Sequence, residues 1–455
     1  MKRNWIVCVV GACIAGPAAA ENLLQVYDQA LTADPTMQQA SATHMATRET
    51  KTQAILNMLP LDVYASKDWS GVQHEGTTQS SAIGTVGLQV NLFQWSNWIA
   101  LKAANATVAQ GEADYAAARQ DLIQRVATLY FAVLYAEDNL TSQQSALQSV
   151  ARQLEQAERR FEVGLIAVTD VQSARASRDS TAAAVIAARR SLSSAQEQLR
   201  AVTTRKYDKL SAPGNDMPLL TPDPASEDSW VSTAMSQNAS LIASRMSAEI
   251  SHDSYLSAFG GHLPSITVAA SRNWDLDGDR NNSVSQSVVN TQDITWSVGV
   301  TVPIFTAGAT QSKVRQANYT YKAAQAALER TSRSTEQQAR DAYQGVISQI
   351  AQVQALKQAV ESNRVALQAT EAGYDVGTKT ALDVLTARQS LVAAETSYAS
   401  AKYSYLNNII ELRLAAGNLD RTTLEQINGW LTETASETPD ASPDAANTPA
   451  TPGAQ

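Results

Sequence analysis

Cysteine is almost absent from this chain. Cys8 and Cys13 are the only two cysteines in 455 residues, and both lie among the first twenty. Lys2 and Arg3 precede an apolar run that ends in small residues, which predicts a secretory signal peptide over 1–20. The mature chain would then hold no cysteine, which excludes disulfides and thiol chemistry. One alternative stays open: a lipoprotein cleavage site would leave Cys13 acylated, although the apolar segment before it is short.

Charged and aromatic residues are scarce, at 17% and 6% of the chain, and the formal net charge is -9. An acidic chain is a poor partner for nucleic acid, so we expect no such partner. Motifs for zinc hydrolases, phosphate loops, dinucleotides and nucleophile elbows are missing, so we expect no catalytic residue, metal site, cofactor or enzymatic activity. The alternating acidic residues from Asp275 to Asn281 lack the spacing of a calcium loop and indicate an acidic surface loop.

Long apolar runs are also missing after residue 20, so no membrane-spanning helix is expected. Two segments within about 59–94 and two within about 263–306 instead alternate apolar with hydroxyl or amide side chains. Each is about ten residues long, as in tilted barrel strands, with polar loops expected at 70–82 and 275–293. A soluble sandwich with one buried face would show the same alternation. Four strands cannot close a barrel, so a membrane barrel requires several copies of the chain.

Tryptophans occur near the ends of these predicted strands. The three residues are Trp69, Trp274 and Trp296. In outer-membrane barrels, aromatic girdles lie at the two interfaces between lipid and water. We therefore expect these side chains to form such a girdle, with outer-membrane lipid around it.

Two segments are long enough for unusually extended helices. The stretch 96–161 has no proline and only one glycine, and its apolar residues follow the 4-3 spacing of a coiled coil. A helix of about 65 residues would measure about 100 Å. A second long helix is expected over 309–374, and a strict period of seven predicts left-handed winding around neighbouring helices. Shorter helices are expected over the following ranges: 36–58, 169–203, 240–261 and 380–416.

The chain is an internal duplication. The stretch Arg160–Val171 resembles Gly373–Val384, and the coiled-coil pattern repeats with the same separation along the chain. This predicts two structural repeats over 21–215 and 216–434, which argues for a pseudo-symmetric scaffold. Each repeat would hold a strand hairpin, a long helix, a glycine-containing turn (162–168 and 375–379) and a shorter helix running back. A tail rich in proline and alanine at 435–455 is expected to be disordered.

Several of these segments together resemble the TolC family of outer-membrane efflux ducts. The segments are Glu21–Tyr27, the Arg-Phe-x-Val-Gly-Leu turn at 160–165, the Gly-Tyr-x-Val-Gly-Thr turn at 373–378, and Val302–Phe305. The resemblance implies an α+β membrane protein: a homotrimer with a twelve-stranded outer-membrane β-barrel, four strands per protomer, continuous with a long periplasmic α-helical barrel. It also implies an exit duct for drugs or secreted proteins in a tripartite efflux or type I secretion system. The partners would be a periplasmic adaptor and an inner-membrane pump, either an ABC transporter or a proton-driven one.

The resemblance assigns a pore role to Asp383, in an acidic ring at a closed periplasmic entrance that opens like an iris. Three carboxylates on a threefold axis would repel one another and attract cations. A local role is equally compatible with the sequence, because Thr380 and Asp383 have the spacing of a helix capping box. The family's second ring aspartate is replaced here by Thr386, which predicts weaker cation binding.

The resemblance also assigns an entrance latch to four residues around the two turns. These are Thr169, Asp170, Tyr374 and Lys379. Lys379 stands where the best-known member of the family has arginine, and a lysine offers a point charge in place of a planar fork, so the latch should hold less tightly. The turn glycines, Gly164 and Gly377, are expected at the periplasmic tip, in contact with the adaptor.

Two other classes of protein stay open on the residues alone. One is a soluble periplasmic coiled-coil adaptor or spacer, in which the strands form a small separate domain. The other is a secreted enzyme, although its motifs are missing. The cargo of a duct is not encoded in any motif that we recognise.

Overall fold

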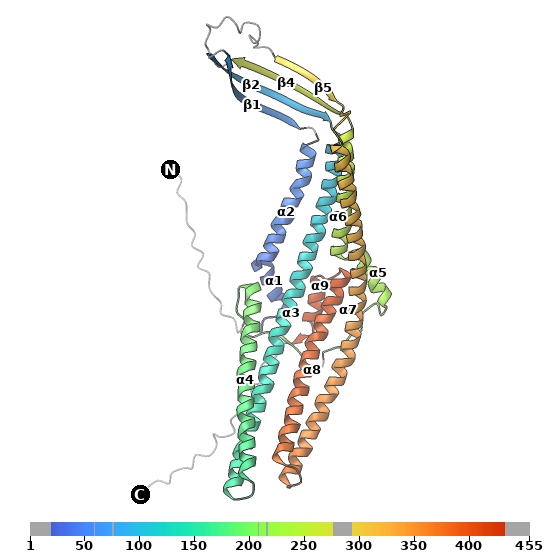
Figure 1. The fold of residues 1–455 in the computed structure, drawn as a ribbon. Helices are drawn as coiled ribbons and strands as arrows, with labels where there is room; N and C mark the ends of the chain where they lie inside the picture. The colour runs from blue at the N-terminus through green and yellow to red at the C-terminus, as the bar shows by residue number, and fades with distance from the viewer. Residues whose placement is uncertain are drawn as a thin grey trace, which may run out of the picture.

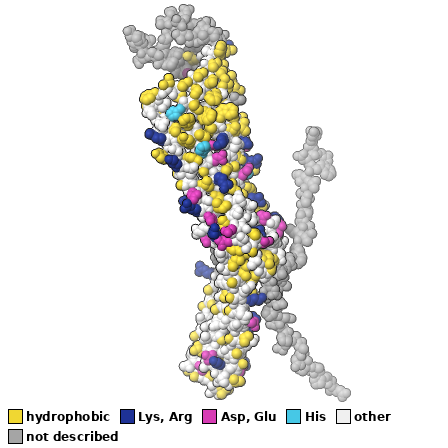
Figure 2. Space-filling model, turned by 90° about the vertical axis from the view of Figure 1, so that its right-hand side faces the viewer, with side chains coloured by type: hydrophobic (Ala, Val, Ile, Leu, Met, Phe, Trp, Pro, Cys, Tyr) yellow, Lys and Arg dark blue, Asp and Glu magenta, His cyan; other side chains and the backbone are white. Residues whose placement is uncertain are grey.

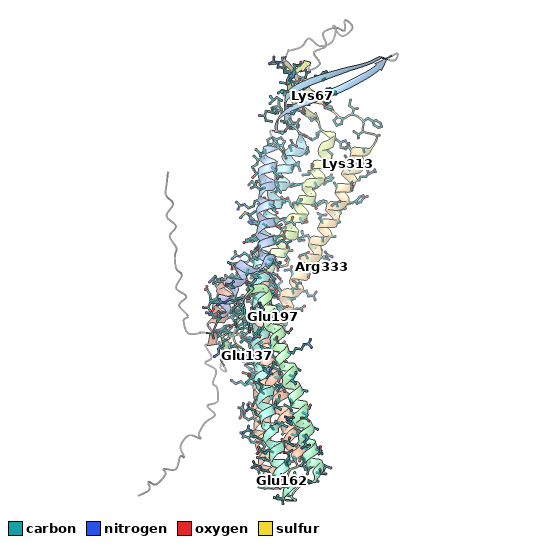
Figure 3. All side chains as sticks on the ribbon, turned by 90° about the vertical axis from the view of Figure 1, so that its left-hand side faces the viewer. Lys67, Glu137, Glu162, Glu197, Lys313 and Arg333 are labelled. Carbon is teal, nitrogen blue, oxygen red and sulfur yellow. The ribbon has the colours of Figure 1, made fainter. Side chains whose placement is uncertain are left out.

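The computed structural model describes residues 20–58, 60–74, 77–207, 209–214, 217–275 and 294–432, and for 70–74, 77–81, 275 and 432 it describes the backbone alone. Residues 1–19 of the predicted signal peptide and the predicted tail at 435–455 lie outside this part of the chain. The molecule is long and narrow, with a β-sheet at one end and two helical turns at the other (Figure 1). The side chains of Lys67 and Glu162 mark these two ends (Figure 3).

Four antiparallel strands form the sheet, in the order β1-β2-β4-β5. Their bounds are β1 (Leu61–His74), β2 (Thr77–Phe93), β4 (Ser265–Asp275) and β5 (Ile294–Thr301). The prediction of a polar loop at 70–82 is wrong, because the β1–β2 ladder continues to the pair His74 and Thr77. Serine, threonine and glycine look like turn residues in sequence, but hydroxyl side chains also pair well across an antiparallel ladder. Most of the loop predicted at 275–293 lies outside the described residues.

Two long helices run the length of the molecule beside four shorter ones. Their bounds are α2 (Pro35–Leu56), α3 (Trp95–Glu162), α4 (Val168–Thr203), α6 (Ala239–Phe259), α7 (Ala309–Asp375) and α8 (Ala381–Ala416). The long helices, α3 and α7, contain 68 and 67 residues. Each is followed by a glycine with a left-handed backbone, Gly164 or Gly377, which lets the chain reverse into α4 and α8. No helix in the described part of the chain has an apolar stretch sufficient to cross a membrane.

The elements lie side by side as a strip four elements wide. Near the sheet the order across the strip is α2-α3-α6-α7, and toward the turns it is α4-α3-α8-α7 (Figure 1). The long helices therefore continue through both halves, while α2 and α6 are replaced by α4 and α8. One flank of the strip is formed by β1, α2 and α4, and the other flank by β5 and α7.

Short elements surround the middle of the strip, outside the helices that the sequence pattern predicted. They are α1 (Leu23–Ala33), β3 (Ala212–Pro213), α5 (Glu227–Gln237), α9 (Arg421–Asn428) and β6 (Leu431–Thr432), and a 3-10 turn, η1 (Gly260–His262), follows α6. Helix α1 begins with a capping box in which Asn22 and Gln25 bond reciprocally. Helices α1 and α5 are themselves a repeated pair, with the same separation along the chain as α2 and α6.

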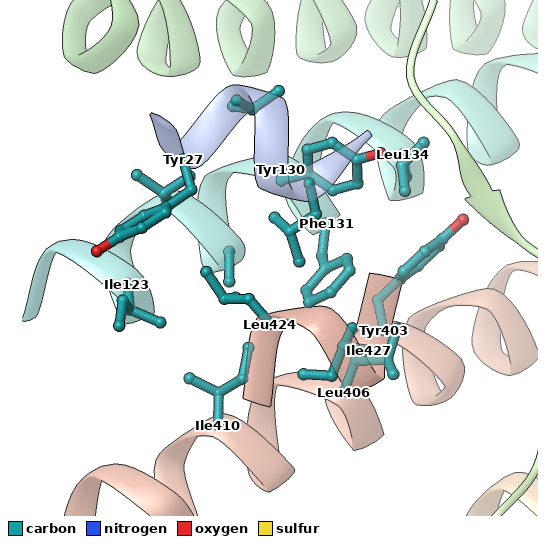
Figure 4. Close-up of a cluster of buried hydrophobic side chains, with 14 of the residues drawn as sticks. Tyr27, Ile123, Tyr130, Phe131, Leu134, Tyr403, Leu406, Ile410, Leu424 and Ile427 are labelled. Carbon is teal, nitrogen blue, oxygen red and sulfur yellow. The ribbon is translucent and has the colours of Figure 1, made fainter. Parts of the chain in front are cut away.

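The largest hydrophobic core lies at this middle level and joins distant parts of the chain (Figure 4). Phe131 from α3 packs near Leu406 of α8 and Leu424 of α9, and all three are fully buried. Burying each such side chain stabilises the fold by about 1.5–3 kcal/mol. The Tyr130 hydroxyl donates to the Ser211 carbonyl at 2.7 Å, and burial raises the pKa of this phenol. The core holds the two repeats together at their common waist.

Candidate functional site

Asp383 lies in the first turn of α8, where it forms a capping box with the N-cap residue Thr380. Its Oδ2 accepts from the backbone N–H of Thr380 at 2.8 Å and from the Thr380 hydroxyl at 2.9 Å, and its own N–H donates back to that hydroxyl at 3.2 Å. The predicted capping box is thus confirmed. These bonds, with the positive charge of Lys379, hold the pKa of the Asp383 carboxyl below its usual range. The carboxylate is solvent-exposed, and its pore role stays a prediction.

The four predicted latch residues lie at the same end of the molecule. Thr169 and Asp170 are in the first turn of α4, Tyr374 is in the last turn of α7, and Lys379 is in the turn between α7 and α8. Among the described residues of this single protomer, no hydrogen bond or ion pair joins the first two to the last two. If these residues form a latch, contacts in the assembly or a shift of the turns must bring them together.

A residue not singled out in the sequence makes the contact between the two turns. The Arg160 guanidinium lies 4.6 Å from the centre of the Tyr374 ring, and 3.7 Å from Oδ1 of Asp375. Cations over aromatic faces are attracted by the ring quadrupole. Arg160 belongs to the Arg-Phe-x-Val-Gly-Leu turn motif, but Gly373 occupies its position in the second repeat, so the repeat itself does not reveal the contact.

Each helical hairpin is held near its turn by the same ion pair. Glu158 and Arg175 join α3 to α4 at 3.0 Å, and Glu371 and Arg388 join α7 to α8. The two pairs occupy equivalent positions in the two repeats. The second pair is the more enclosed, because the Arg388 side chain is 20% exposed and the Arg175 side chain 53%. Both hairpins are thus closed locally, independently of what joins one hairpin to the other.

A polar cleft of about 390 Å³ lies between the two hairpins near the turns. Its walls include Arg152, Gln153, Glu371, Tyr374 and Arg388. Gln153 spans it from α3, donating to the Ala381 carbonyl at 3.3 Å. Within the described residues, no group of His, Cys, Asp or Glu side chains is arranged to hold a metal ion. The cleft is a polar seam between the hairpins, crossed near the turns by the Gln153 hydrogen bond and by the contacts of Arg160 with Tyr374 and Asp375.

The two turn glycines project from the end of the molecule. Gly164 has φ +75° and Gly377 has φ +80°, and a Cβ built on either would meet no atom within 4 Å. Their conformation needs glycine, while the space around them is open. The turns are therefore free to contact another molecule.

One face of the sheet is apolar and exposed in the single protomer. The side chains of Leu61, Val63, Val298 and Val300 point to this face and are 58–68% exposed. The hydrophobic side chains gather at this end of the molecule in Figure 2. Such a face on a soluble protein would be a liability, and it fits contact with lipid or another partner.

The three predicted girdle tryptophans point to this same face, at two levels. Trp274 is the penultimate residue of β4 and pairs with Gly84 of β2. Trp69 of β1 pairs with Ala82, which is the next residue of β2 on the same face, so Trp69 and Trp274 lie at about the same level. Trp296 pairs with Ala270, which is four residues nearer the helices than Trp274. Trp69 lies inside β1 and not near its end, because that strand is longer than predicted. Trp69 and Trp296 are 74% and 76% exposed.

A profile of the family described as "Outer membrane efflux protein" matches residues 26–205 and 230–418. The chain belongs to this family. The two matched ranges correspond to the two repeats, and the unmatched part between them contains β3. The resemblance drawn from the sequence is confirmed.

Curated relatives match this outer membrane efflux protein over most of its length. "Outer membrane protein TolC" of Vibrio cholerae is 34% identical over 414 residues, covering 90% of this chain and 94% of the relative. The TolC protein of Escherichia coli is 33% identical, covering 96% and 91%. "Alkaline protease secretion protein AprF" of Pseudomonas aeruginosa is 28% identical, covering 94% and 91%.

Solved structures show the same fold. The CmeC outer membrane channel of Campylobacter jejuni has a TM-score of 0.72 at 20% identity, covering 90% of this chain and 89% of that one. The outer membrane protein VceC of Vibrio cholerae has a TM-score of 0.72 at 21% identity, covering 87% and 96%. The fold is that of outer-membrane efflux channels, largely helical with a small sheet.

These findings establish the location and the general role of the protein. It is an outer-membrane protein, and it serves as an outer-membrane exit duct of efflux or secretion systems. Its relatives are TolC-type channels, which are transporters rather than enzymes.

Proposed function

We propose that three copies of this outer membrane efflux protein close into a ring that forms a continuous duct. The observation that carries the proposal is the strip architecture. The sheet and both helical levels present the same two open flanks, with β1, α2 and α4 on one side and β5 and α7 on the other. Two different flanks that meet head to tail generate a closed ring when the rotation between copies fits. Three four-stranded sheets then form a twelve-stranded barrel above a helical barrel.

The flanks carry features that a neighbouring copy would cover. Within the described residues, β1 and β5 are the two edges of the sheet, and the outer backbone groups of each have no partner strand. Ile186 on α4 is 69% exposed and Val365 on α7 is 54% exposed, at sites where a coiled-coil neighbour would bury them. In the closed ring the apolar sheet face contacts lipid, the tryptophans lie at the interfaces, and the polar face lines the lumen.

The duct is closed at the helical turns and opens there. In this proposal three copies of Asp383 form a cation-attracting ring, and Thr169, Asp170, Tyr374 and Lys379 latch the closed entrance. The cation–π contact of Arg160 with Tyr374 supports a closed arrangement of the two hairpins within one protomer. Opening would separate the hairpins along the polar cleft, in the manner of an iris.

The partners are a periplasmic adaptor at the turns around Gly164 and Gly377, and an inner-membrane pump that supplies the energy, either an ABC transporter or a proton-driven pump. Open space around both glycines supports docking at this end. The names of the relatives point to two kinds of cargo: AprF is named for secretion of alkaline protease, and the family profile is named for efflux. We therefore propose that the duct conducts drugs or secreted proteins.

The assembly is tested by measuring the mass of the purified mature protein in detergent. We expect a trimer that separates into single chains on heating in denaturing detergent. A monomer in detergent would contradict the duct, since one four-stranded sheet cannot enclose a pore.

The entrance is tested by recording single channels in planar bilayers. Asp383→Ala should sharply reduce block by trivalent cations, and unchanged block would remove Asp383 from the pore. Asp170→Ala combined with Tyr374→Phe should raise conductance if the Tyr374 hydroxyl is part of the latch. Phenylalanine keeps the ring over which Arg160 lies, so a contribution of Arg160 needs its own variant. Arg160→Ala should raise conductance even where Tyr374→Phe alone has no effect.

A further inference from the structure

The duplication that shapes one protomer also predicts how two protomers meet. Across the strip, the first repeat contributes α2 and α3 and the second contributes α6 and α7, so the contact between α3 and α6 joins two repeats. In a closed ring of such strips, α7 of one copy meets α2 of the next. Because α7 is the equivalent of α3 and α2 is the equivalent of α6, this contact pairs the same two kinds of helix as the contact between α3 and α6. The interface inside the chain is therefore a template for the interface between copies. This argument rests on the ring proposed above.

The template contains a well-defined ion pair near the sheet. Lys102 on α3 places its Nζ 2.8 Å from Oδ1 of Asp253 and 3.6 Å from Oε1 of Glu249, both on α6. The Asp253 side chain is 0% exposed, so this carboxylate depends on its partner. The pair fixes the register of α3 against α6 at one point.

The sequences around this pair repeat closely. Leu101–Thr107 reads LKAANAT and Val314–Thr320 reads VRQANYT, in the alignment that also superimposes the two turns. Thr47–Thr50 reads TRET and Ser251–Ser254 reads SHDS, in the alignment that superimposes the starts of α2 and α6. Lys102 thus corresponds to Arg315 on α7, and Asp253 corresponds to Glu49 on α2. Both positions keep the sign of their charge.

The counterparts face the open flanks of the protomer. Arg315 and Glu49 are both exposed, and neither has a hydrogen-bond or ion-pair partner among the described side chains of its own chain. Arg315 borders a shallow concavity of about 630 Å³ on α7, next to Tyr319, which is 67% exposed. On α2, Met45 occupies the position of Glu249 and is 60% exposed. A basic and an aromatic side chain on one flank thus match an acidic and an apolar side chain on the other.

We infer that Arg315 of one copy pairs with Glu49 of the next, with Met45 of that copy packed near Tyr319, as the contact that sets the register between protomers. The pair inside the chain supplies the geometry. Both counterparts are exposed and have no partner among the described side chains, so a second copy can contact them.

The same rule predicts a second contact lower in the molecule. Within the chain, Gln120 donates to the carbonyl of Gly417, the residue that ends α8, at 2.8 Å. Arg333 is the equivalent of Gln120 in the second repeat. Thr204 is the equivalent of Gly417 in the first repeat, and it ends α4 with the same left-handed backbone. Arg333 lies in the half of α7 nearer the sheet and is 77% exposed (Figure 3). Its Nε–H donates to Glu329 of the same helix at 2.7 Å, and its remaining N–H groups are thus placed to donate to the Thr204 carbonyl of the next copy.

Paired cysteines test the inference, with the template as the matched control. One double variant carries Glu49→Cys and Arg315→Cys, and the control double variant carries Lys102→Cys and Asp253→Cys. Both are treated with the same short bismaleimide as assembled proteins in detergent. We expect the first variant to give linked dimers and trimers on denaturing gels. We expect the second to give only a shifted single chain, because its two positions lie in one protomer. Each single-cysteine variant reports any link that uses another thiol, and none is expected.

The outcomes separate the register from the ring. A protein that is trimeric by mass, in which the control links within the chain and the 49/315 variant forms no interchain product, overturns the inferred pair and leaves the ring intact. A protein that is monomeric by mass overturns the ring and the inference together. Charge exchange gives an independent check. Arg315→Glu and Glu49→Arg should each lower the temperature at which the trimer separates by several degrees, and the double variant should recover most of that loss; failure to recover contradicts the pairing.

Discussion

Two glycines with the same left-handed backbone show how surroundings set the importance of a single residue. Gly377 has open space where a Cβ would lie, whereas a Cβ on Gly417 would lie 2.4 Å from the carbonyl oxygen of Gln237. Gly377 tightens an exposed turn, and Gly417 lets the end of α8 press against the junction of α5 and α6. Backbone conformation alone does not distinguish them.

We expect Gly377→Ala to lower the free energy of unfolding by about 1–2 kcal/mol, the cost of a left-handed backbone for an L-residue. Gly417→Ala should cost roughly 3 kcal/mol or more, because backbone atoms must also move. Denaturant titration of the assembled protein in detergent measures both. Equal losses would show that the contact with Gln237 does not constrain this helix end.

Asp383 makes the stability of the α8 terminus depend on pH. Its pKa is lowered in the folded chain, so its contribution is present above the ordinary aspartate pKa of about 3.9 and is lost as pH falls through the lowered value. Hydrogen-exchange protection factors in the first turn of α8 should therefore drop in acid. The double variant Thr380→Val with Asp383→Asn lacks the titrating cap, and its protection should be low and nearly independent of pH.

At the scale of elements, the two repeats solve the same capping problem with different chemistry. Asp34 caps α2, accepting from the Met37 N–H at 3.2 Å, and its buried carboxylate pairs with Arg125 of α3 at 2.8 Å. Asn238 caps α6 at the equivalent position, accepting from the Leu241 N–H at 3.0 Å and donating to the Ala415 carbonyl. The residue equivalent to Arg125 is Gln338. The first repeat thus uses an ion pair where the second uses a hydrogen bond from the Asn238 amide to a backbone carbonyl.

This difference predicts a conversion of one repeat into the other. Arg125→Gln alone should lower the free energy of unfolding by about 3 kcal/mol, since it leaves the Asp34 carboxylate buried without its cation. Adding Asp34→Asn should restore most of the loss, because asparagine caps a helix as well as aspartate. Thermal unfolding of the three proteins checks this. A double variant no more stable than Arg125→Gln would show that the ion pair contributes more than relief of a buried charge.

At the scale of the whole molecule, the exposed apolar sheet face makes the single protomer incomplete. Val298 points to this face and pairs with Val268, whereas the adjacent Ser297 points to the polar face. A lysine on the lipid-facing side of a barrel costs about 2–4 kcal/mol at the bilayer midplane, and a lumen-facing one costs little. Neighbouring residues of one strand should therefore respond differently to the same substitution.

We expect Val298→Lys to reduce the amount of protein in the outer-membrane fraction, and Ser297→Lys to leave it near the level of the unchanged protein. Fractionation followed by immunoblotting compares them. If both variants insert equally well, the assignment of the two faces of β5 is wrong.

The helices and strands that the sequence predicted are those with long, regular patterns. The bounds of α3 lie one residue outside the predicted range at each end, because a seven-residue repeat over so many turns leaves little doubt about the period. Helices α1, α5 and α9 have 8–11 residues, too few for a period to stand out, and their stability comes from the core that they cover. Strands β1 and β2 were predicted too short because their ends farthest from the helices are rich in residues that also favour turns.

The candidate site divides in the same way. The capping box of Asp383 is local, confined to one turn of helix, and could be predicted. The contact of Arg160 with Tyr374 joins residues from different repeats, and the duplication gave no hint because the counterpart of Arg160 is glycine. The ion pair of Lys102 with Asp253 likewise depends on the packing of α3 beside α6, which the sequence does not specify.

The sequence by itself determined the duplication, the period of the helices and the turns that reverse them, because spacing and backbone conformation are local properties of the chain. Only the tertiary structure decided which elements are neighbours across the strip, and hence which flanks stay open. Which elements are neighbours depends on how the faces of distant segments pack in three dimensions. Two equivalent helix faces have similar local sequences, so the sequence pattern does not tell which face is covered within the chain and which is left for a second copy.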